Sequence, residues 1–253
     1  MISEHPRELI VKNAILRNYD NVDFASLRPY FESVVLKKRD LLQEPRRPIK
    51  NIYFIESGLV SSATHTLGNM IETSIVGRHG VIGAAVVLGA KASMHQSTVL
   101  ISGSALRIGV DDMHRVMVEH PLIREGLLHY IHAVIVESAQ RTLCAVHHKL
   151  EQRLACWLSI ACDVLSGTVL PVTHERLSVI LGVRRAGLTE SLIRFEKYGL
   201  IYKSRGVIQI RDCSALKEKA CSCYNIITST YRENEVLPVA GQFWRFDQHG
   251  VRN

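Results

Sequence analysis

The sequence predicts an α+β protein of two domains, in which a β-rich N-terminal domain, a long helix and a helical C-terminal domain with a small hairpin follow one another. Residues 33–110 contain short β-prone runs separated by glycines and polar turns. Residues 121–146 are mostly helix-forming, and residues 173–210 have the pattern of two short helices followed by two alternating strands. With 253 residues, the chain is long enough for two modest domains, each with its own core.

The N-terminal domain should begin with two short helices, at about residues 8–16 and 24–31, the second capped by Asp23. The β-prone runs lie at residues 34–36, 52–55, 58–60, 71–76, 81–88, 98–101 and 105–110. Several short strands at this spacing predict an all-β sandwich or roll.

The long helix should start at Pro121, which suits a first helical turn. Its apolar positions come close to a 3.5-residue repeat, but the stripe is too wide for a pure coiled coil. We therefore expect one face to pair with a second copy of the chain and the other to cover the β-roll; the alternative is a buried intradomain helix. The expected dimerisation residues are Leu127, Ile131, Val134 and Ser138.

The pattern after residue 172 is that of a helix-turn-helix. Thr173 can cap a first helix, and Gly182 can make the turn, because a tight turn needs a residue that tolerates positive φ. Arg184 then opens a second helix that turns Leu188, Leu192 and Phe195 inward. Residues 200–203 and 207–210 alternate like two strands around Ser204-Arg205-Gly206, and this completes a winged helix-turn-helix.

The charge distribution agrees with a nucleic-acid partner. The chain carries a net charge of +7 with a pI near 9.2, and residues 149–211 hold ten Lys or Arg against five Asp or Glu. Basic excess at the helix-turn-helix is what phosphate contact requires, although such a face is often only a solvated surface.

This order of elements resembles the Crp/Fnr family of bacterial transcription regulators over about 200 residues. In that family a β-roll similar to cyclic-nucleotide-binding domains precedes a dimerisation helix and a DNA-binding domain. The resemblance implies a β-roll sensor at residues 1–111, a dimerisation helix at 112–147, the winged helix-turn-helix at 148–216 and a C-terminal helix and tail at 217–253. It also implies a dimeric, sequence-specific regulator that binds a palindromic operator and RNA polymerase.

The second helix departs from the family's common recognition pattern. Arg185 matches the first arginine of that pattern, but Ala186, Gly187 and Glu190 replace its glutamate, threonine and later arginine. We therefore expect a target sequence unlike the common half-sites. The expected DNA-binding residues are Thr173, His174, Arg184, Arg185, Gly187, Glu190, Lys203 and Arg205.

The sensor also departs from the cyclic-nucleotide binders. Residues 77–83 resemble the loop that enters the ligand pocket, but Ala84 replaces the glutamate that holds the ribose, and His95-Gln96 replaces the Arg-Ser pair that holds the phosphate. Without a guanidinium the pocket loses its charge-assisted hydrogen bonds, so we expect no cyclic AMP binding. The effector is unidentified, and its expected pocket comprises Arg78, Gly83, Ala84, His95 and Gln96.

No cofactor or metal is assigned from the sequence. An Fnr-type cluster needs N-terminal cysteines, and the first cysteine is Cys144. Haem ligation by His79, His95, His129 or His132 and metal or redox sensing by Cys221 and Cys223, with Cys213, stay open. A single C-x-C pair falls short of a tetrahedral site, and on a helix its side chains diverge by about 200°. Cys156 and Cys162 should be small core residues.

Two other classes of function are less consistent with the sequence. One is a ligand-binding regulatory module that acts through protein contacts; the other is an enzyme, for which no catalytic motif is found. No apolar stretch of membrane-spanning length and no secretory signal are found, so we expect a cytoplasmic protein with no membrane partner. One helix is expected at residues 214–231, and residues 238–253 have no periodic pattern.

Overall fold

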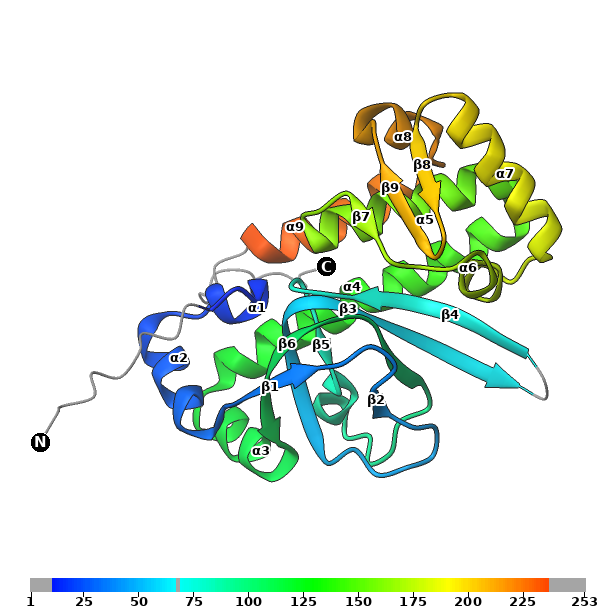
Figure 1. Cartoon of the computed structure of the whole chain (residues 1–253). Helices are drawn as coiled ribbons and strands as arrows, with labels where there is room; N and C mark the ends of the chain where they lie inside the picture. Colours follow the sequence, from blue (N-terminus) through cyan, green and yellow to red (C-terminus); the bar gives the residue numbers. More distant parts are fainter. Residues whose placement is uncertain (1–10, 67–68, 237–253) are drawn as a thin grey trace, which may run out of the picture.

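The computed structural model describes residues 11–66 and 69–236. A sheet domain and a C-terminal helical domain lie at the two ends of one long helix, α4 (Pro121–His147) (Figure 1). The predicted α+β architecture, with an N-terminal sheet domain, a long helix and a winged helix-turn-helix, is confirmed. The unassigned tail at residues 238–253 lies outside the described residues.

The sheet domain contains one six-stranded antiparallel sheet with the path β1-β6-β3-β4. β2 pairs with β6, and β5 pairs with β3. The strands are β1 (Glu32–Leu36), β2 (Leu41–Gln43), β3 (Asn51–Thr66), β4 (Asn69–Val76), β5 (Val81–Ile82) and β6 (Gln96–Gly109). The two long strands β3 and β6 pair over most of their length, from Asn51 opposite Gly109 to Ala63 opposite Gln96.

β3 and β6 each contain two β-prone segments that the sequence analysis predicted as separate strands, divided at a glycine. Residues 52–55 and 58–60 both belong to β3, and residues 98–101 and 105–109 both belong to β6. Gly58 has φ +85 at a register shift in β3, and a Cβ on Gly103 would lie only 2.1 Å from the Ser57 carbonyl oxygen. The glycines therefore allow bulges and close approach within continuous strands instead of ending them.

Several expected element boundaries in this domain are wrong. Of the expected strand at residues 81–88, only β5 is extended, because Gly83 and Gly89 adopt positive φ around a 3₁₀ helix, η2 (Ala84–Leu88). The N-terminal helices are α1 (Ala14–Arg17) and α2 (Asn21–Leu27), followed by η1 (Arg28–Tyr30). Asp20, not Asp23, caps α2 by accepting from two backbone N–H groups, and Asp23 instead contacts His120.

A further helix, α3 (Val110–Glu119), precedes α4 and is absent from the sequence prediction. The chain breaks helical geometry at His120, immediately before Pro121. The interval 112–147 expected as one dimerisation helix therefore contains parts of two helices, because a proline cannot continue the hydrogen bonding of a preceding helix.

The C-terminal domain packs its helices around Trp157 and Phe195, both fully buried. Its elements are α5 (Leu150–Leu165), β7 (Val169–Leu170), α6 (His174–Leu181), α7 (Arg185–Lys197), β8 (Ile201–Ser204), β9 (Val207–Ile210), α8 (Cys213–Lys219) and α9 (Cys223–Val236). The sheet order is β7-β9-β8, so a short strand that the sequence did not reveal completes the wing.

The single helix expected at residues 214–231 is two helices, α8 and α9. Extended backbone at Ala220 (φ −71, ψ 156) ends α8, and α9 begins at Cys223 and runs back beside α4 (Figure 1). The break places Cys221 and Cys223 outside one continuous helix.

Candidate nucleic-acid interface and sensor cavity

The helix-turn-helix has the geometry that the sequence predicts. Thr173 Oγ1 accepts a hydrogen bond from the Arg176 backbone N–H at 3.1 Å and so caps α6. Gly182 ends α6 with φ +62, and the Arg153 guanidinium donates to the Leu181 carbonyl beside it. Leu177 and Leu188 are fully buried between the two helices, so the first turn of α7 faces outward.

The N-terminal end of α7 presents unpaired cationic side chains. Arg184 and Arg185 are exposed, and neither forms an ion pair with any residue that the structure describes. Arg194, further along α7, is instead paired with Glu151. The free N–H groups at the start of a helix add partial positive charge, so this end of α7 favours an anionic partner.

His174 lies at the start of α6, next to α7. Its Nδ1 lies 3.3 Å from Thr189 Oγ1 on α7. Partial burial, with Lys203 and Arg185 nearby, lowers the pKa of His174. The contact with Thr189 places the His174 ring against α7.

The four remaining expected DNA-contact positions differ in what they offer. Gly187 faces inward, since a Cβ on it would lie 3.6 Å from Leu150 on α5. The Lys203 ammonium is held at 2.9 Å by Glu196, whereas Arg205 is exposed at the tip of the hairpin. Exposed Glu190 adds negative charge to α7.

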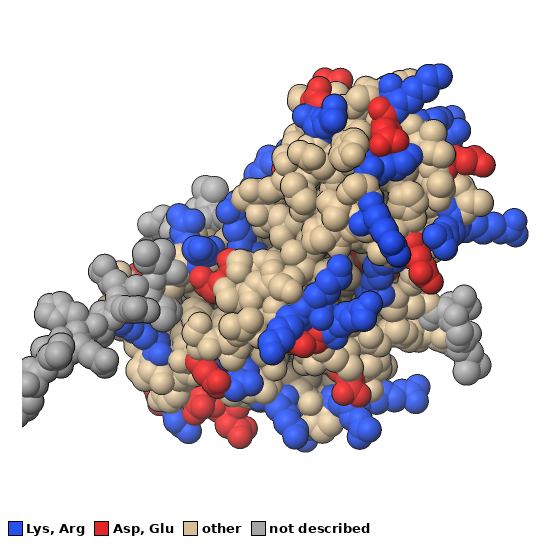
Figure 2. Space-filling view, in the orientation of Figure 1, with Lys and Arg blue, Asp and Glu red and all other residues tan. Residues whose placement is uncertain are grey.

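The basic surface continues beyond the helix-turn-helix. Figure 2 shows lysine and arginine side chains over the region of α7 and the β8–β9 hairpin and along the face toward the sheet domain, with acidic side chains interspersed among those of the C-terminal domain. Lys38 of the sheet domain donates to the Pro171 carbonyl at 3.0 Å, next to the start of α6.

A cavity of about 280 Å³ lies between the sheet, η2 and α4. Of the expected effector residues, Gly83, Ala84 and His95 line it. Arg78 lines a separate cavity near α1 and α5, and Gln96 donates to Thr98 instead. Two of the five expected residues are therefore outside this cavity.

The cavity is neutral and mostly apolar. Its described lining contains neither lysine nor arginine, and its polar groups are hydroxyls, His95 and Gln43. Partial burial lowers the pKa of His95, which favours the uncharged imidazole. Gln43 Nε2 is a buried donor with no hydrogen-bond partner in the described structure.

The long helix presents a different face to solvent from the one expected. Leu127 is 0 % exposed and Ile131 is buried, both in the sheet-domain core, while Val134 and Ser138 line the cavity. The outward stripe is one position further along, and its steps alternate between three and four residues: His132, Ile135, Ala139, Thr142 and Val146. Ile135 is 60 % exposed and Val146 is 73 % exposed.

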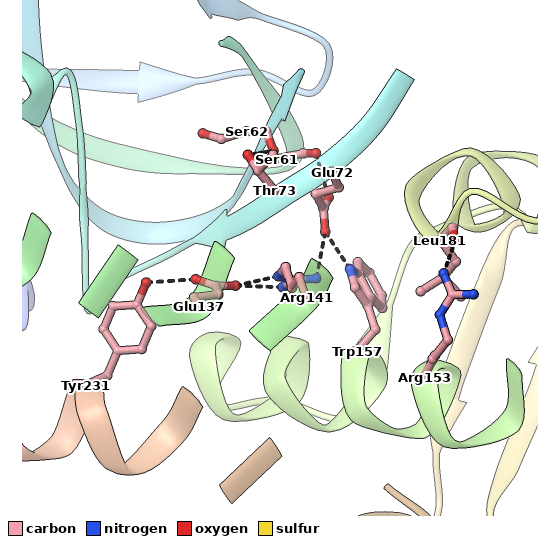
Figure 3. A network of polar contacts seen from close by, with 10 residues as sticks. All are labelled: Ser61, Ser62, Glu72, Thr73, Glu137, Arg141, Arg153, Trp157, Leu181 and Tyr231. Atoms are coloured by element: carbon pink, nitrogen blue, oxygen red, sulfur yellow. Dashed lines mark hydrogen bonds and ion pairs between the residues drawn. The ribbon is translucent and has the colours of Figure 1, made fainter. Parts of the chain in front are cut away.

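A buried polar network joins the two domains (Figure 3). The carboxylate of Glu72, on β4, accepts hydrogen bonds from Ser61 Oγ at 2.5 Å and from Trp157 Nε1 at 2.7 Å. The Arg141 guanidinium lies 3.7 Å from Glu72 and donates through Nε to Glu137 at 2.7 Å. Tyr231, on α9, donates to Glu137 at 2.7 Å. The network thus connects β4, α4, α5 and α9.

One ion pair of this network could have been predicted from the sequence. Glu137 and Arg141 are spaced i, i+4 on α4, which is typical of an ion pair on one helix face. Their partners, Glu72 and Trp157, are far away in the chain and had no local signal.

Three of the four candidate haem ligands, His79, His95 and His132, lie in different places. His95 lines the sensor cavity, and His132 is exposed on the outward stripe of α4. The His79 ring packs edge-on against Tyr231 with centroids 4.5 Å apart, and burial lowers the pKa of His79 to about 4.

The cysteines do converge. Cys144 and His148, at the end of α4, lie beside Cys221 and Cys223, with all four ligand atoms within 4.8 Å of one another. Cys213, which the sequence offered as a redox partner, is outside this group. The fold therefore adds Cys144 and His148 to the C-x-C pair.

Comparison with known proteins agrees with this geometry. Residues 152–219 match the model of the Crp-like helix-turn-helix domain. A Crp/Fnr-family regulator from Eubacterium rectale has a TM-score of 0.62 at 15% identity, over 81% of this chain and 96% of that one. The chain has the Crp/Fnr regulator fold. No curated protein sequence matches.

Two further solved structures support the same fold. FixK2 from Bradyrhizobium japonicum has a TM-score of 0.66 at 12% identity, covering 76% of this chain and 98% of that one. CLP from Xanthomonas campestris, described as a c-di-GMP-responsive global regulator, has a TM-score of 0.62 at 13% identity, covering 76% and 100%. The Crp/Fnr proteins matched here are transcription regulators, not enzymes. Within the described residues, no helix is long and apolar enough to cross a membrane.

Proposed function

We propose that this chain is a dimeric transcription regulator that reads a palindromic DNA site through α7 and senses a small uncharged ligand other than cyclic AMP. The observation that carries the proposal is the exposed, unpaired Arg184-Arg185 pair at the start of α7 in a Crp-like helix-turn-helix. Arginine donates bidentately to the O6 and N7 of guanine in the major groove, which is the commonest specific base contact. The acidic Glu190 and the inward Gly187 support a half-site different from those read through the common pattern.

The dimer should form through the outward stripe of α4. Alternating steps of four and three residues keep these side chains on one seam of two crossing helices. Single exposed apolar side chains are common on protein surfaces. A regular stripe on α4, the helix that joins the two domains, instead supports pairing with α4 of a second copy of the chain. Two recognition helices related by a twofold axis would then read half-sites about 34 Å apart.

The proposed ligand follows from the cavity. A charged phosphate would be buried there without a cation, so cyclic AMP and the two phosphates of a cyclic dinucleotide such as c-di-GMP are both disfavoured. A mostly apolar molecule with one acceptor would satisfy the orphan Gln43 Nε2. Since Ile135 belongs to both the cavity lining and the outward stripe, such a ligand would contact the proposed dimer seam directly.

A regulator of this kind also needs a cellular location and a partner in transcription. We infer that the regulator acts in the cytoplasm and contacts RNA polymerase once bound to its operator. A regulatory module acting only through protein contacts is the second candidate, and DNA binding separates it from the first.

The test is affinity for duplex DNA as a function of salt. Operators are selected from a random duplex library, and binding is measured by fluorescence anisotropy for the selected and a scrambled duplex. We expect affinity for both to fall steeply with salt, because phosphate contacts release counterions, and the selected site to be palindromic and bound at least 10³-fold more tightly. No salt-dependent binding to any duplex would overturn the proposal.

A further inference from the structure

The end of α4 and the junction between α8 and α9 bring together four side chains with zinc-ligand chemistry. Cys144 and His148 lie one helical turn apart, and Cys221 and Cys223 flank Ser222 where α9 begins. Cys144 Sγ is 3.4 Å from Cys221 Sγ, and Cys223 Sγ is 3.5 Å from His148 Nδ1. All four ligand atoms are mutually within 4.8 Å.

These separations suit a single tetrahedral ion. Zn–S bonds of about 2.3 Å and Zn–N bonds of about 2.0–2.1 Å place tetrahedral ligands roughly 3.6–3.8 Å apart. The Cys223–His148 pair is already close to this spacing, the Cys144–Cys221 pair would open by a few tenths of an ångström, and the other pairs need to close by about an ångström at most.

The backbone explains how two short motifs point at one centre. Cys144 occupies the last turn of α4, and His148 leaves that helix with extended backbone (φ −105, ψ 144), which returns its ring toward the turn below. Extended Ala220 ends α8, so the Cys221 and Cys223 side chains do not diverge as they would on one helix. The result is a C-x₃-H pair facing a C-x-C pair.

We propose that Cys144, His148, Cys221 and Cys223 bind one Zn²⁺ ion as a structural Cys₃His site. Three soft thiolates and an imidazole select zinc over the hard cations Mg²⁺ and Ca²⁺, and four protein ligands leave no open position for catalysis. The three cysteines are buried and His148 is half-buried, as is usual for a closed structural site. A small cavity lined by Cys144 and Cys223 provides an entry path for the ion.

Cys156 on α5 has a supporting place beside this group. It lines the same small cavity as Cys144 and Cys223 but is not one of the four clustered ligands. A side chain beside a ligand set in this way can influence how the ligands are oriented.

The site would join parts of the chain that meet at the domain boundary. Cys144 and His148 lie where α4 gives way to α5, and Cys221 and Cys223 lead directly into α9, which returns along α4. A bound ion would hold α9 against the end of α4 and so limit the angle at which the helix-turn-helix leaves the sheet domain. This inference does not depend on DNA binding, because its primary readout is metal content.

The experiment measures zinc in the full-length protein purified under reducing conditions without chelators. Plasma mass spectrometry should give one zinc per chain for the unmodified protein, and below about 0.2 for Cys221→Ser, Cys223→Ser and His148→Ala. Cys162→Ser is the matched control, because Cys162 is also a buried thiol but lies outside the cluster; it should keep one zinc. Circular dichroism of each variant checks that the fold is intact.

A second measurement depends on no variant. The unmodified protein, freed of metal by chelation in the presence of a reductant, is titrated with Co²⁺, which should give thiolate-to-cobalt charge transfer and intense visible bands of tetrahedral coordination. Zn²⁺ should bleach both and raise the Tm. Absence of zinc together with no Co²⁺ spectrum would overturn the proposal, as would iron and sulfide in the purified protein or a disulfide within the cluster that persists under reductant.

Discussion

Trp157 Nε1 donates a 2.7 Å hydrogen bond to the buried Glu72 carboxylate, and this contact joins the first helix of the DNA-binding domain to strand β4 of the sheet domain. The same carboxylate receives Ser61 Oγ and faces Arg141 on the long helix. A buried carboxylate is costly unless every oxygen is paired. Glu72 therefore couples three elements that must keep their places together.

Removing this carboxylate should destabilise the protein strongly. Glu72→Leu leaves the Trp157 N–H and the Ser61 hydroxyl without their acceptor, so the free energy of unfolding should fall by about 1–3 kcal/mol for each of these buried donors. Trp157→Phe removes one hydrogen bond to the same carboxylate and should cost about 1–3 kcal/mol. Urea denaturation measures both, and an exposed control, Glu190→Leu, should stay within about 0.5 kcal/mol. A Glu72→Leu protein of unchanged stability would show that the network does not stabilise the fold.

Glu72 should also make stability depend on pH in an identifiable direction. Burial raises the pKa of Glu72 above its usual 4.5, and its hydrogen bonds and Arg141 only partly oppose this. At a pH between the unfolded pKa of 4.5 and the raised folded pKa, Glu72 is more protonated in the folded protein than in the unfolded chain. Its contribution to stability therefore falls as the pH rises through this range.

The Glu72→Gln variant isolates that effect, because an amide does not titrate. We expect the stability of the variant relative to the unmodified protein to increase with pH across this window and to level off above it. Urea denaturation at intervals from pH 4.5 to 8 measures the difference. A difference that stays constant with pH would mean that Glu72 does not titrate in this range.

Arg185 should contribute to sequence preference and not merely to affinity. Arg185→Ala should cost about 1–3 kcal/mol on the selected operator and little on random DNA, because a bidentate contact to guanine is lost. Arg194→Ala provides the matched control, since that arginine lies on the same helix but is paired with Glu151. Equal losses on both duplexes would assign Arg185 to phosphate contact.

The outward stripe of α4 should control dimerisation. Ile135→Glu and Val146→Glu place charges in the proposed seam and should give monomers by analytical ultracentrifugation, with the fold intact by circular dichroism. Val118→Glu is the control, because Val118 is 81 % exposed on α3 and should leave the dimer intact. Leu127→Glu should instead unfold the sheet domain, since that side chain has no exposed surface. Dimers that persist in both seam variants would place the interface elsewhere.

Cyclic AMP should neither bind tightly nor stabilise the protein. A nucleotide at 100-fold excess over a micromolar Kd would stabilise the fold by about 2.7 kcal/mol. We expect no such change in Tm and no heat of binding by calorimetry, because the cavity lining offers a phosphate no cation. Micromolar binding would mean that the phosphate finds a cation elsewhere.

The sequence by itself determined the winged helix-turn-helix, because its signals act over a few residues. Thr173 caps α6, Gly182 supplies the left-handed turn, and the inward leucines of α7 follow the helical period. The β-rich domain was equally predictable as a class. Its strand ends were not, because glycines at 58 and 103 indicate turns in sequence, whereas in the sheet they allow bulges and close approach.

Only the tertiary structure decided which face of α4 is free and which distant side chains meet. The apolar stripe of α4 is so wide that the sequence does not show which positions face the sheet domain and which face solvent. The structure shows that Leu127 and Ile131 pack into the sheet-domain core. Glu72 and Trp157 are 85 residues apart, and Cys144 and Cys221 are 77 apart. Local periodicity carries no information about such pairs, because their contact is set by how whole domains pack.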